Sequence, residues 1–186
     1  MDSGNIGFVL ICAAFVFVMT PGLAMFYGGL VRKKNVVNTM MTSIFIIGIG
    51  IVMWVLFGYS LSFAPSGNAF IGDFRWLGLE GVSLTEGYTD DASIPNMVFS
   101  AFQMMFAVIT PALITGAVAG RMKFKSIFVF TIFWSLIVYY PLAHMVWNGG
   151  LLSADGAISQ AIGAAAHDFA GGTVVHINAA VAALVI

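Results

Sequence analysis

One histidine lies deep within an apolar stretch of the sequence. His176 follows Asp168 by eight residues, which places it about 12 Å along a helix that rises 1.5 Å per residue. That depth is close to the middle of a bilayer, where an ionisable side chain is costly and marks a candidate functional site. A neutral imidazole carries one donor and one acceptor, so it can pass a proton or hydrogen-bond a small polar solute. The alternative is a core histidine bonded to a neighbouring helix, and position alone favours neither.

Asp168 begins the same apolar stretch and has two interpretations. Aspartate is a favoured N-cap because its carboxylate accepts hydrogen bonds from the free N–H groups of the first helical turn. A carboxylate at the mouth of a membrane helix would also attract a cation without binding it directly. The N-cap is the simpler prediction, and the two roles are compatible.

Aromatic residues share one face of the predicted third helix. Phe99, Phe102 and Phe106 are spaced i, i+3 and i+7, so Phe102 and Phe106 lie one turn apart. Trp147 lies near the end of the predicted fourth helix. Aromatic faces attract a desolvated cation, so Phe102, Phe106 and Trp147 are candidate cation-binding residues. The alternatives are core packing for the phenylalanines and an interfacial position for the tryptophan.

A second histidine lies on the predicted fourth helix. Tyr140, His144 and Trp147 are spaced i, i+4 and i+7, which gives this helix an amphipathic face that a purely lipid-facing helix would lack. We expect His144 to connect helices through hydrogen bonds rather than to titrate.

The composition requires a membrane around these residues. The chain has 186 residues, of which 60% are hydrophobic and 8% are charged, where a soluble domain carries about 25% charged residues. Its mean hydropathy is +1.00. The net charge of −1 provides no cationic field for nucleic acid. Soluble enzymes and nucleic-acid binders are therefore excluded, and we expect no enzyme activity, no metal and no cofactor.

The elements that must position the candidate residues are membrane helices. Uncharged stretches long enough to cross roughly 30 Å of hydrocarbon predict an all-α polytopic membrane protein with five transmembrane helices in a single domain. We place the helices near 6–30, 38–62, 96–119, 126–150 and 169–186, with a turn at Ala64-Pro65-Ser66-Gly67.

The charges predict the orientation of these helices. The basic residues of the two short links are Arg32, Lys33, Lys34, Arg121, Lys123 and Lys125, and no acidic residue accompanies them. The acidic residues fall on the opposite side: Asp2, Asp73, Glu80, Glu86, Asp90, Asp91 and Asp155. By the positive-inside rule, the short links are cytoplasmic and the amino terminus is outside. We therefore expect a multi-pass protein of the cytoplasmic (inner or plasma) membrane.

The end of the chain suggests a truncated polypeptide. Val185-Ile186 closes an apolar stretch that has no basic anchor and no polar flank. Five spans are also half of an inverted-repeat transporter, because five more would then run in the opposite direction. We expect a further half to exist or a partner chain to supply it.

Three sequence strings then point to one family. They are PGLAMFYGGLVRKKN at 21–35, AHMVW at 143–147 and DFAGGTVVHIN at 168–178. Over essentially the whole chain the sequence resembles the ammonium transporter family, which comprises Amt and Mep proteins and the related Rhesus proteins. The resemblance implies the first inverted repeat of a fold of about eleven helices, assembled as a homotrimer.

The resemblance also implies a role for each candidate residue. Trp147 and Phe102 resemble walls of an outer site that recruits ammonium, and Phe106 resembles one of two stacked phenylalanines that close the pore below it. Asp168 resembles an aspartate near that site, and His176 resembles the first of two histidines that line the pore. The implied mechanism is recruitment of ammonium, its deprotonation and the passage of ammonia.

Other features of the family remain expectations. The resemblance implies membrane lipid and ammonium as partners, and a possible regulatory protein of the PII class on the cytoplasmic face. The second histidine and the second gate phenylalanine would lie in the other half. Two alternatives stay open: an ammonium sensor on the same fold fused to a cytoplasmic signalling domain, and an inactive half-transporter.

Overall fold

The fold was analysed in a computed structural model of the chain, which describes residues 1–65, 68–89 and 92–186. Part of the predicted turn, Ser66-Gly67, lies outside the described residues, as do Asp90 and Asp91. Within the described ranges the protein is helical, and strand-like pairing is limited to an isolated bridge between Gly87 and Pro95. The prediction of an all-α membrane fold is confirmed.

Four long apolar helical segments and one shorter segment make up the body of the protein. The α-helices are α1 (Ser3–Leu30), α2 (Val36–Met53), α3 (Tyr59–Phe63), α4 (Asn96–Val118), α5 (Phe124–Trp134), α6 (Tyr140–Trp147), α7 (Ala157–Ile162) and α8 (Asn178–Val185). π-Helical turns at Trp54–Gly58, Ser135–Tyr139 and Gly172–Ile177 join α2 to α3 and α5 to α6, and precede α8. Short 3-10 turns lie at Lys33–Asn35 and Leu77–Leu79.

The last segment, Gly172–Val185, corresponds to the predicted fifth membrane helix. It is shorter than the other four, each of which has at least 18 residues. It begins three residues after the predicted start because a left-handed turn precedes it. Another short helix, α7, lies in the connection between α6 and this segment, where no helix was predicted.

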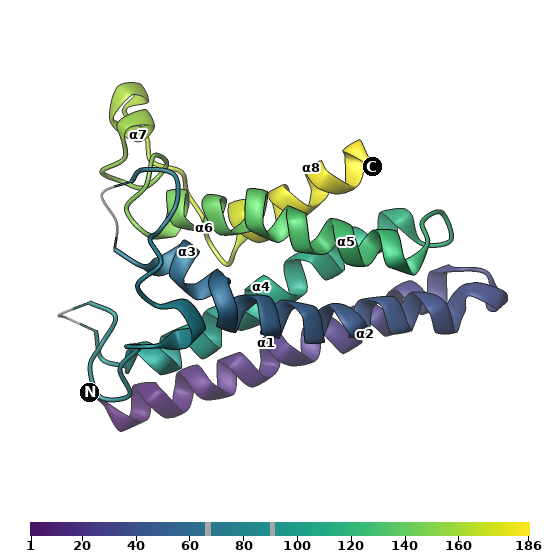
Figure 1. The fold of residues 1–186 in the computed structure, drawn as a ribbon, viewed down its shortest axis with the longest axis horizontal. Coiled ribbons are helices and arrows are strands. Elements are labelled where there is room, and N and C mark those ends of the chain that lie inside the picture. The colour runs from purple at the N-terminus through teal and green to yellow at the C-terminus, as the bar shows by residue number, and fades with distance from the viewer. Residues whose placement is uncertain (66–67, 90–91) are drawn as a thin grey trace.

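The helices pack in pairs, several of which join segments that are far apart in the sequence. α1 lies against α2 and α4, α4 lies against α8, and α3 lies against α6 (Figure 1). Small residues allow the close approaches. A Cβ added at Gly58 would lie 2.7 Å from the Tyr140 ring, and one added at Gly50 would lie 3.0 Å from Val108. Glycine is therefore required where α2 and α3 meet their neighbours.

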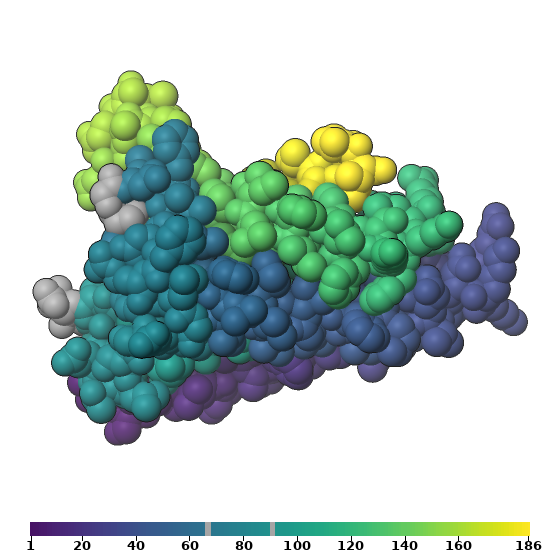
Figure 2. All heavy atoms as spheres, in the orientation of Figure 1, coloured from purple at the N-terminus to yellow at the C-terminus, as the bar shows by residue number. Residues whose placement is uncertain are grey.

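The charged segments separate to opposite ends of the molecule. Figure 1 shows the links α1–α2 and α4–α5 at one end, which we call the basic end. The amino terminus lies at the other end, which we call the loop end. The described residues between α3 and α4 lie there too, as does α7. Figure 2 shows α7 projecting from the body at this end. This separation of charge is the arrangement expected of a multi-pass membrane protein.

Much of the apolar surface of α1 is uncovered. Phe8 is 69% exposed and Phe15 is 71% exposed. Of the 18 consecutive residues of this helix that are most apolar, only 6% are buried. In water such a surface would aggregate, so lipid or further protein must cover it. The chain is a multi-pass membrane protein.

Candidate functional site

A tight left-handed turn positions the start of the fifth membrane helix. Ala170 has φ +52° and Gly171 has φ +76°, a backbone region that is strained for residues with a Cβ. Asp168 Oδ1 accepts a hydrogen bond from the Thr173 N–H at 2.6 Å. The helix cap itself is Gly171, so the Asp168 carboxylate satisfies a first-turn donor from three residues before the cap.

His176 lies in the π-helical turn that follows. Its backbone N–H donates to the Gly171 carbonyl at 3.1 Å, a span of five residues rather than the four of an α-helix. π-Helical turns are frequent at functional sites because they shift the side chains of the next residues around the helix. The imidazole is exposed rather than packed against a neighbouring helix within the described residues.

The second oxygen of Asp168 binds the indole of Trp147. Trp147 Nε1 donates to Asp168 Oδ2 at 2.5 Å, across 21 residues of sequence. One carboxylate therefore accepts from both α6 and the fifth membrane helix. Hydrogen bonds to an ionised carboxylate are roughly twice as strong as neutral ones, so this contact fixes the tryptophan firmly.

One face of the Trp147 ring packs against another aromatic ring. Phe63, at the end of α3, stacks on Trp147 with ring centroids 6.2 Å apart and an interplanar angle of 12°. Phe63 in turn contacts Phe99 of α4 edge to face at 5.1 Å. Trp147 is thus held at its N–H by a carboxylate and on one face by an aromatic cluster.

Phe102 and Phe106 form a separate aromatic pair on α4. Their centroids are 5.1 Å apart and their planes are nearly perpendicular, at 84°. Edge-to-face contact is a favourable geometry for two phenyl rings. In the described ranges the ring contacts of Trp147 are with Phe63 and not with Phe102.

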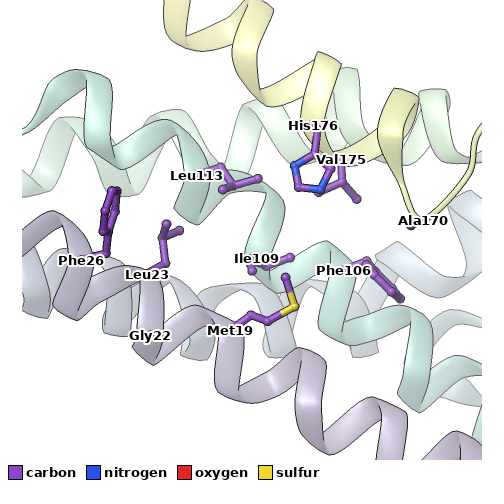
Figure 3. A pocket seen from close by; sticks show the side chains of 10 residues that line it. All are labelled: Met19, Gly22, Leu23, Phe26, Phe106, Ile109, Leu113, Ala170, Val175 and His176. Carbon is purple, nitrogen blue, oxygen red and sulfur yellow. The ribbon is translucent and has the colours of Figure 1, made fainter.

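Phe106 and His176 line one cavity of about 350 Å³ between α1, α4 and the fifth membrane helix. Figure 3 shows the His176 imidazole directed into this space, with Phe106 and Ile109 of α4 on a second wall and Leu23 of α1 on a third. The lining residues are Met19, Gly22, Leu23, Phe26, Phe106, Ile109, Leu113, Ala170, Val175 and His176. The imidazole is the one titratable side chain among them, so the cavity disfavours ions and accommodates small neutral solutes.

A second cavity of about 230 Å³ continues from His176. It is lined by Tyr27, Leu113, His176, Ala179, Ala180 and Ala183. The Tyr27 hydroxyl donates to the Leu113 carbonyl at 2.9 Å. A Cβ added at Gly116 would lie 2.5 Å from the Tyr27 ring, so the tyrosine occupies the space that this glycine leaves. His176 and Leu113 therefore border both cavities.

Comparison with known proteins decides the family. A sequence model described as Ammonium Transporter Family matches residues 7–186. The chain belongs to the ammonium transporter family. The ammonium transporter of Bacillus subtilis is 48% identical over 186 residues, which cover 100% of this chain and 43% of that protein. The ammonium transporter of Aquifex aeolicus is 43% identical over 187 residues, which cover 100% and 41%.

Solved structures of ammonium transporters have the same fold. The crystal structure of Saccharomyces cerevisiae Mep2 matches with a TM-score of 0.84 at 33% identity, covering 100% of this chain and 42% of that one. A structure described as "Sensor Amt Protein" matches with a TM-score of 0.77 at 28% identity, covering 92% and 40%. This member of the ammonium transporter family spans about two fifths of the length of the curated relatives that it matches.

Sequence reasoning missed several residues of this candidate site. Tyr27 could have been found because, beside Thr20, it carries a hydroxyl in a largely apolar span, and it lies within the string that carries the family resemblance. Phe63 had no such signal, because its contact with Trp147 depends on how α3 packs against α6. Within the described ranges no group of three His, Cys, Asp or Glu side chains is placed to hold a metal ion.

Two titratable groups at the loop end have shifted pKa values. A side-chain hydrogen bond from Arg75 lowers the pKa of Asp73, and the two side chains also form an ion pair at 2.7 Å. Burial raises the pKa of Tyr88 to about 12, so its phenol stays protonated and can donate a hydrogen bond. Neither group lines the cavities beside His176.

Proposed function

We propose that this chain forms the ammonium-recruiting site and one wall of the ammonia pore of an ammonium transporter. The observation that carries the proposal is the juxtaposition of a carboxylate-bound tryptophan with an apolar cavity that contains His176. Trp147 and Asp168 share a hydrogen bond of 2.5 Å, and Asp168 also accepts from the Thr173 N–H in the first turn of the helix that bears His176. One carboxylate therefore links the proposed recruitment residue to the helix that carries the proposed conduction residue.

Each part of the site has a physical role in this proposal. The Trp147 ring attracts ammonium by cation–π interaction, with Phe102 as a second aromatic wall, and the negative charge of Asp168 raises the local concentration of the cation. The intact cation would lose its hydration shell in the apolar cavity, at a cost of several kcal/mol. Ammonium therefore gives up its proton before entry, and neutral ammonia passes Phe106.

His176 acts next, inside the cavity. Its imidazole offers one donor and one acceptor to ammonia in a space whose other lining residues are mostly apolar. That hydrogen bonding compensates ammonia for part of its lost hydration. In the preceding deprotonation, one N–H bond of ammonium breaks and its proton passes to water at the outer mouth. Ammonia is neutral, so the released proton carries the whole charge of the ammonium, and its route is a separate part of the cycle.

The complete assembly is part of the same proposal. We place the basic end in the cytoplasm and the amino terminus outside a cytoplasmic (inner or plasma) membrane, because six basic residues gather at that end without an acid. A further half, supplied by the same or another polypeptide, would cover the open side of His176. We further propose a homotrimer, and a PII-type regulator as the partner for the basic end.

Replacing the pore histidine tests the proposal. In the full-length protein reconstituted in liposomes, His176→Ala should abolish or alter ammonium-selective flux, because the cavity then loses its only titratable lining group. The matched control is His167→Ala, which removes an exposed imidazole that lines neither cavity. Unchanged flux and selectivity in His176→Ala would refute the role of the histidine.

A sensor is the second candidate function, and the structural similarity to a sensor Amt protein favours it. Such a protein would bind ammonium at the same site and transmit the signal without conducting. The liposome assay separates the two functions. Flux that depends on ammonium supports the transporter, whereas ammonium binding without flux supports the sensor.

A further inference from the structure

The end of α3 lies beside the end of α6, and its last carbonyl groups need hydrogen-bond donors. The final carbonyls of any helix have no partner within the helix, and an unsatisfied carbonyl is expensive where water is scarce. The Leu61 carbonyl accepts from the Gly72 N–H at 2.7 Å. The Ala64 carbonyl accepts from Asn148 Nδ2 at 3.1 Å. A side chain that follows α6 therefore caps α3.

His144 of α6 extends this contact. Its side chain is buried, and its Nε2 lies 2.9 Å from the Asn68 carbonyl. Its Nδ1 lies 3.1 Å from Asn148 Nδ2 and 3.2 Å from the Ser62 carbonyl. A ring nitrogen accepts from an amide NH2 group only when it carries no proton, and it donates to a carbonyl only when it carries one. Nδ1 can therefore bind only one of these two groups at a time.

The hydrogen-bond partners select one tautomer of His144. Nε2 faces a carbonyl, so it must carry the proton and donate. Nδ1 is then unprotonated and accepts from Asn148 Nδ2. The opposite tautomer would place two acceptors, Nε2 and the Asn68 carbonyl, 2.9 Å apart. The Nε2–H tautomer is therefore the one that bonds both the Asn68 carbonyl and Asn148. It requires Asn148 to present its NH2 group, and in it Nδ1 makes no hydrogen bond to the Ser62 carbonyl 3.2 Å away.

Tyr88 fixes the orientation of the Asn148 amide. The Tyr88 hydroxyl donates to Asn148 Oδ1, which leaves the NH2 group to face the Ala64 carbonyl and His144 Nδ1. A flipped amide would turn its oxygen toward the Ala64 carbonyl and the unprotonated His144 Nδ1 and lose both of these hydrogen bonds. Asn148 is thus the central residue of a network that joins three separate segments: the end of α3, the loop that carries Tyr88, and the end of α6.

This network surrounds the residues that hold Trp147. Trp147 immediately precedes Asn148, and Phe63, which stacks on its ring, lies between the Ser62 and Ala64 carbonyls. The Tyr88 ring also contacts Phe63 edge to face, with centroids 5.8 Å apart. Any shift of α3 relative to α6 would move Phe63 away from Trp147.

We infer that Asn148, together with His144 and Tyr88, is a positioning residue that sets the orientation of Trp147 for ammonium recruitment. The inference rests on the proposed function of Trp147. It adds that ammonium recruitment requires a correctly oriented tryptophan and not merely a tryptophan at this position. The side-chain hydrogen bonds at the end of α6, and not only the Asp168 carboxylate, determine the apparent affinity of the outer site.

Kinetics of the full-length protein in liposomes test this inference. Asn148→Ala should raise the apparent KM for ammonium about fivefold, which corresponds to about 1 kcal/mol. The maximal flux should stay within about twofold of wild type, because the cavity beside His176 is untouched. Gln160→Ala is the matched control, since it removes a side-chain amide of the same connection whose hydrogen bond, among the residues that the structure describes, is to the Ala154 carbonyl. Its KM should equal that of wild type.

A double-mutant cycle with Trp147→Leu shows whether Asn148 acts through the tryptophan. If it does, Asn148→Ala raises KM in the wild-type background and has no further effect in the Trp147→Leu background. Equal fold-changes in both backgrounds, or an unchanged KM for Asn148→Ala, would overturn the inference. An unchanged KM for Trp147→Leu by itself would instead contradict the proposed recruitment site.

Tyr88→Phe keeps the test decisive if Asn148→Ala does not fold. This variant removes a single hydroxyl in a loop and retains the ring contacts of Tyr88. It should raise KM in the same direction, by a smaller factor, and the increase should also vanish in the Trp147→Leu background. An unchanged KM in folded Tyr88→Phe would count against the network.

Discussion

Replacing Asp168 by asparagine changes one atom of a group that accepts two hydrogen bonds. Both carboxylate oxygens face N–H donors: Oδ1 faces Thr173 at 2.6 Å and Oδ2 faces Trp147 at 2.5 Å. An asparagine has one acceptor oxygen and one NH2 group, so one of the two donors must face another donor. The variant also loses the negative charge that strengthens the remaining bond.

The size of the effect follows from these two losses. Conversion of one charge-assisted bond to a neutral one costs about 1 kcal/mol. Leaving a part-buried N–H without an acceptor costs about 1–2 kcal/mol, the lower part of the range for a fully buried group. We therefore expect Asp168→Asn to lower the free energy of unfolding by about 2–3 kcal/mol. Because Trp147 is released, the apparent KM for ammonium should rise as well.

Unfolding of the purified full-length protein in detergent, followed by denaturant titration, measures this loss. Asp155→Asn is the matched control, since it removes the same charge from an exposed position in the neighbouring connection. It should leave the free energy of unfolding almost unchanged. If Asp168→Asn were also within about 0.5 kcal/mol of wild type, the carboxylate would not join α6 to the fifth membrane helix as described.

Three further predictions concern single contacts. Trp147→Phe keeps an aromatic face but loses the indole N–H, so in liposome flux assays it should raise the ammonium KM less than Trp147→Leu does. Gly116→Val places carbon atoms where the Tyr27 ring lies, and overpacking of this kind costs about 1–3 kcal/mol; thermal melting should show the loss. Because Arg75 lowers the pKa of folded Asp73, their contribution to stability is present above the usual carboxyl pKa of 3.8 and is lost as the pH falls through the lowered value. Arg75→Gln should raise that pKa in an NMR titration, with little change in stability because both side chains are solvent-accessible.

The fold class could be predicted because the bilayer imposes it. A long uncharged stretch must form a helix to satisfy its backbone, and the basic residues are concentrated in the short links. The predicted start of the fifth helix was less accurate. The sequence Ala170-Gly171 gave no clear sign of a left-handed turn, and glycine is also common inside membrane helices.

The site could be predicted only where a residue type is unusual for its depth. His176, Asp168 and Trp147 were conspicuous in apolar surroundings, and the structure brings Asp168 and Trp147 into contact. The contacts of Phe63 and Asn148 depend on how the end of α3 meets the end of α6. Neither local spacing nor hydropathy carries that information, because the two segments are about 80 residues apart in the sequence.

The central claim, that the two cavities beside His176 form the path of ammonia, is tested most directly by filling them. Leu113 lines both cavities, so Leu113→Trp in the full-length protein should reduce ammonium flux in liposomes at least tenfold without raising KM. Ile137→Trp, at a position that is 69% exposed on the surface, controls for the added indole and should conduct normally. Folded Leu113→Trp protein with wild-type flux would contradict the claim, because ammonia would then have to cross the protein elsewhere.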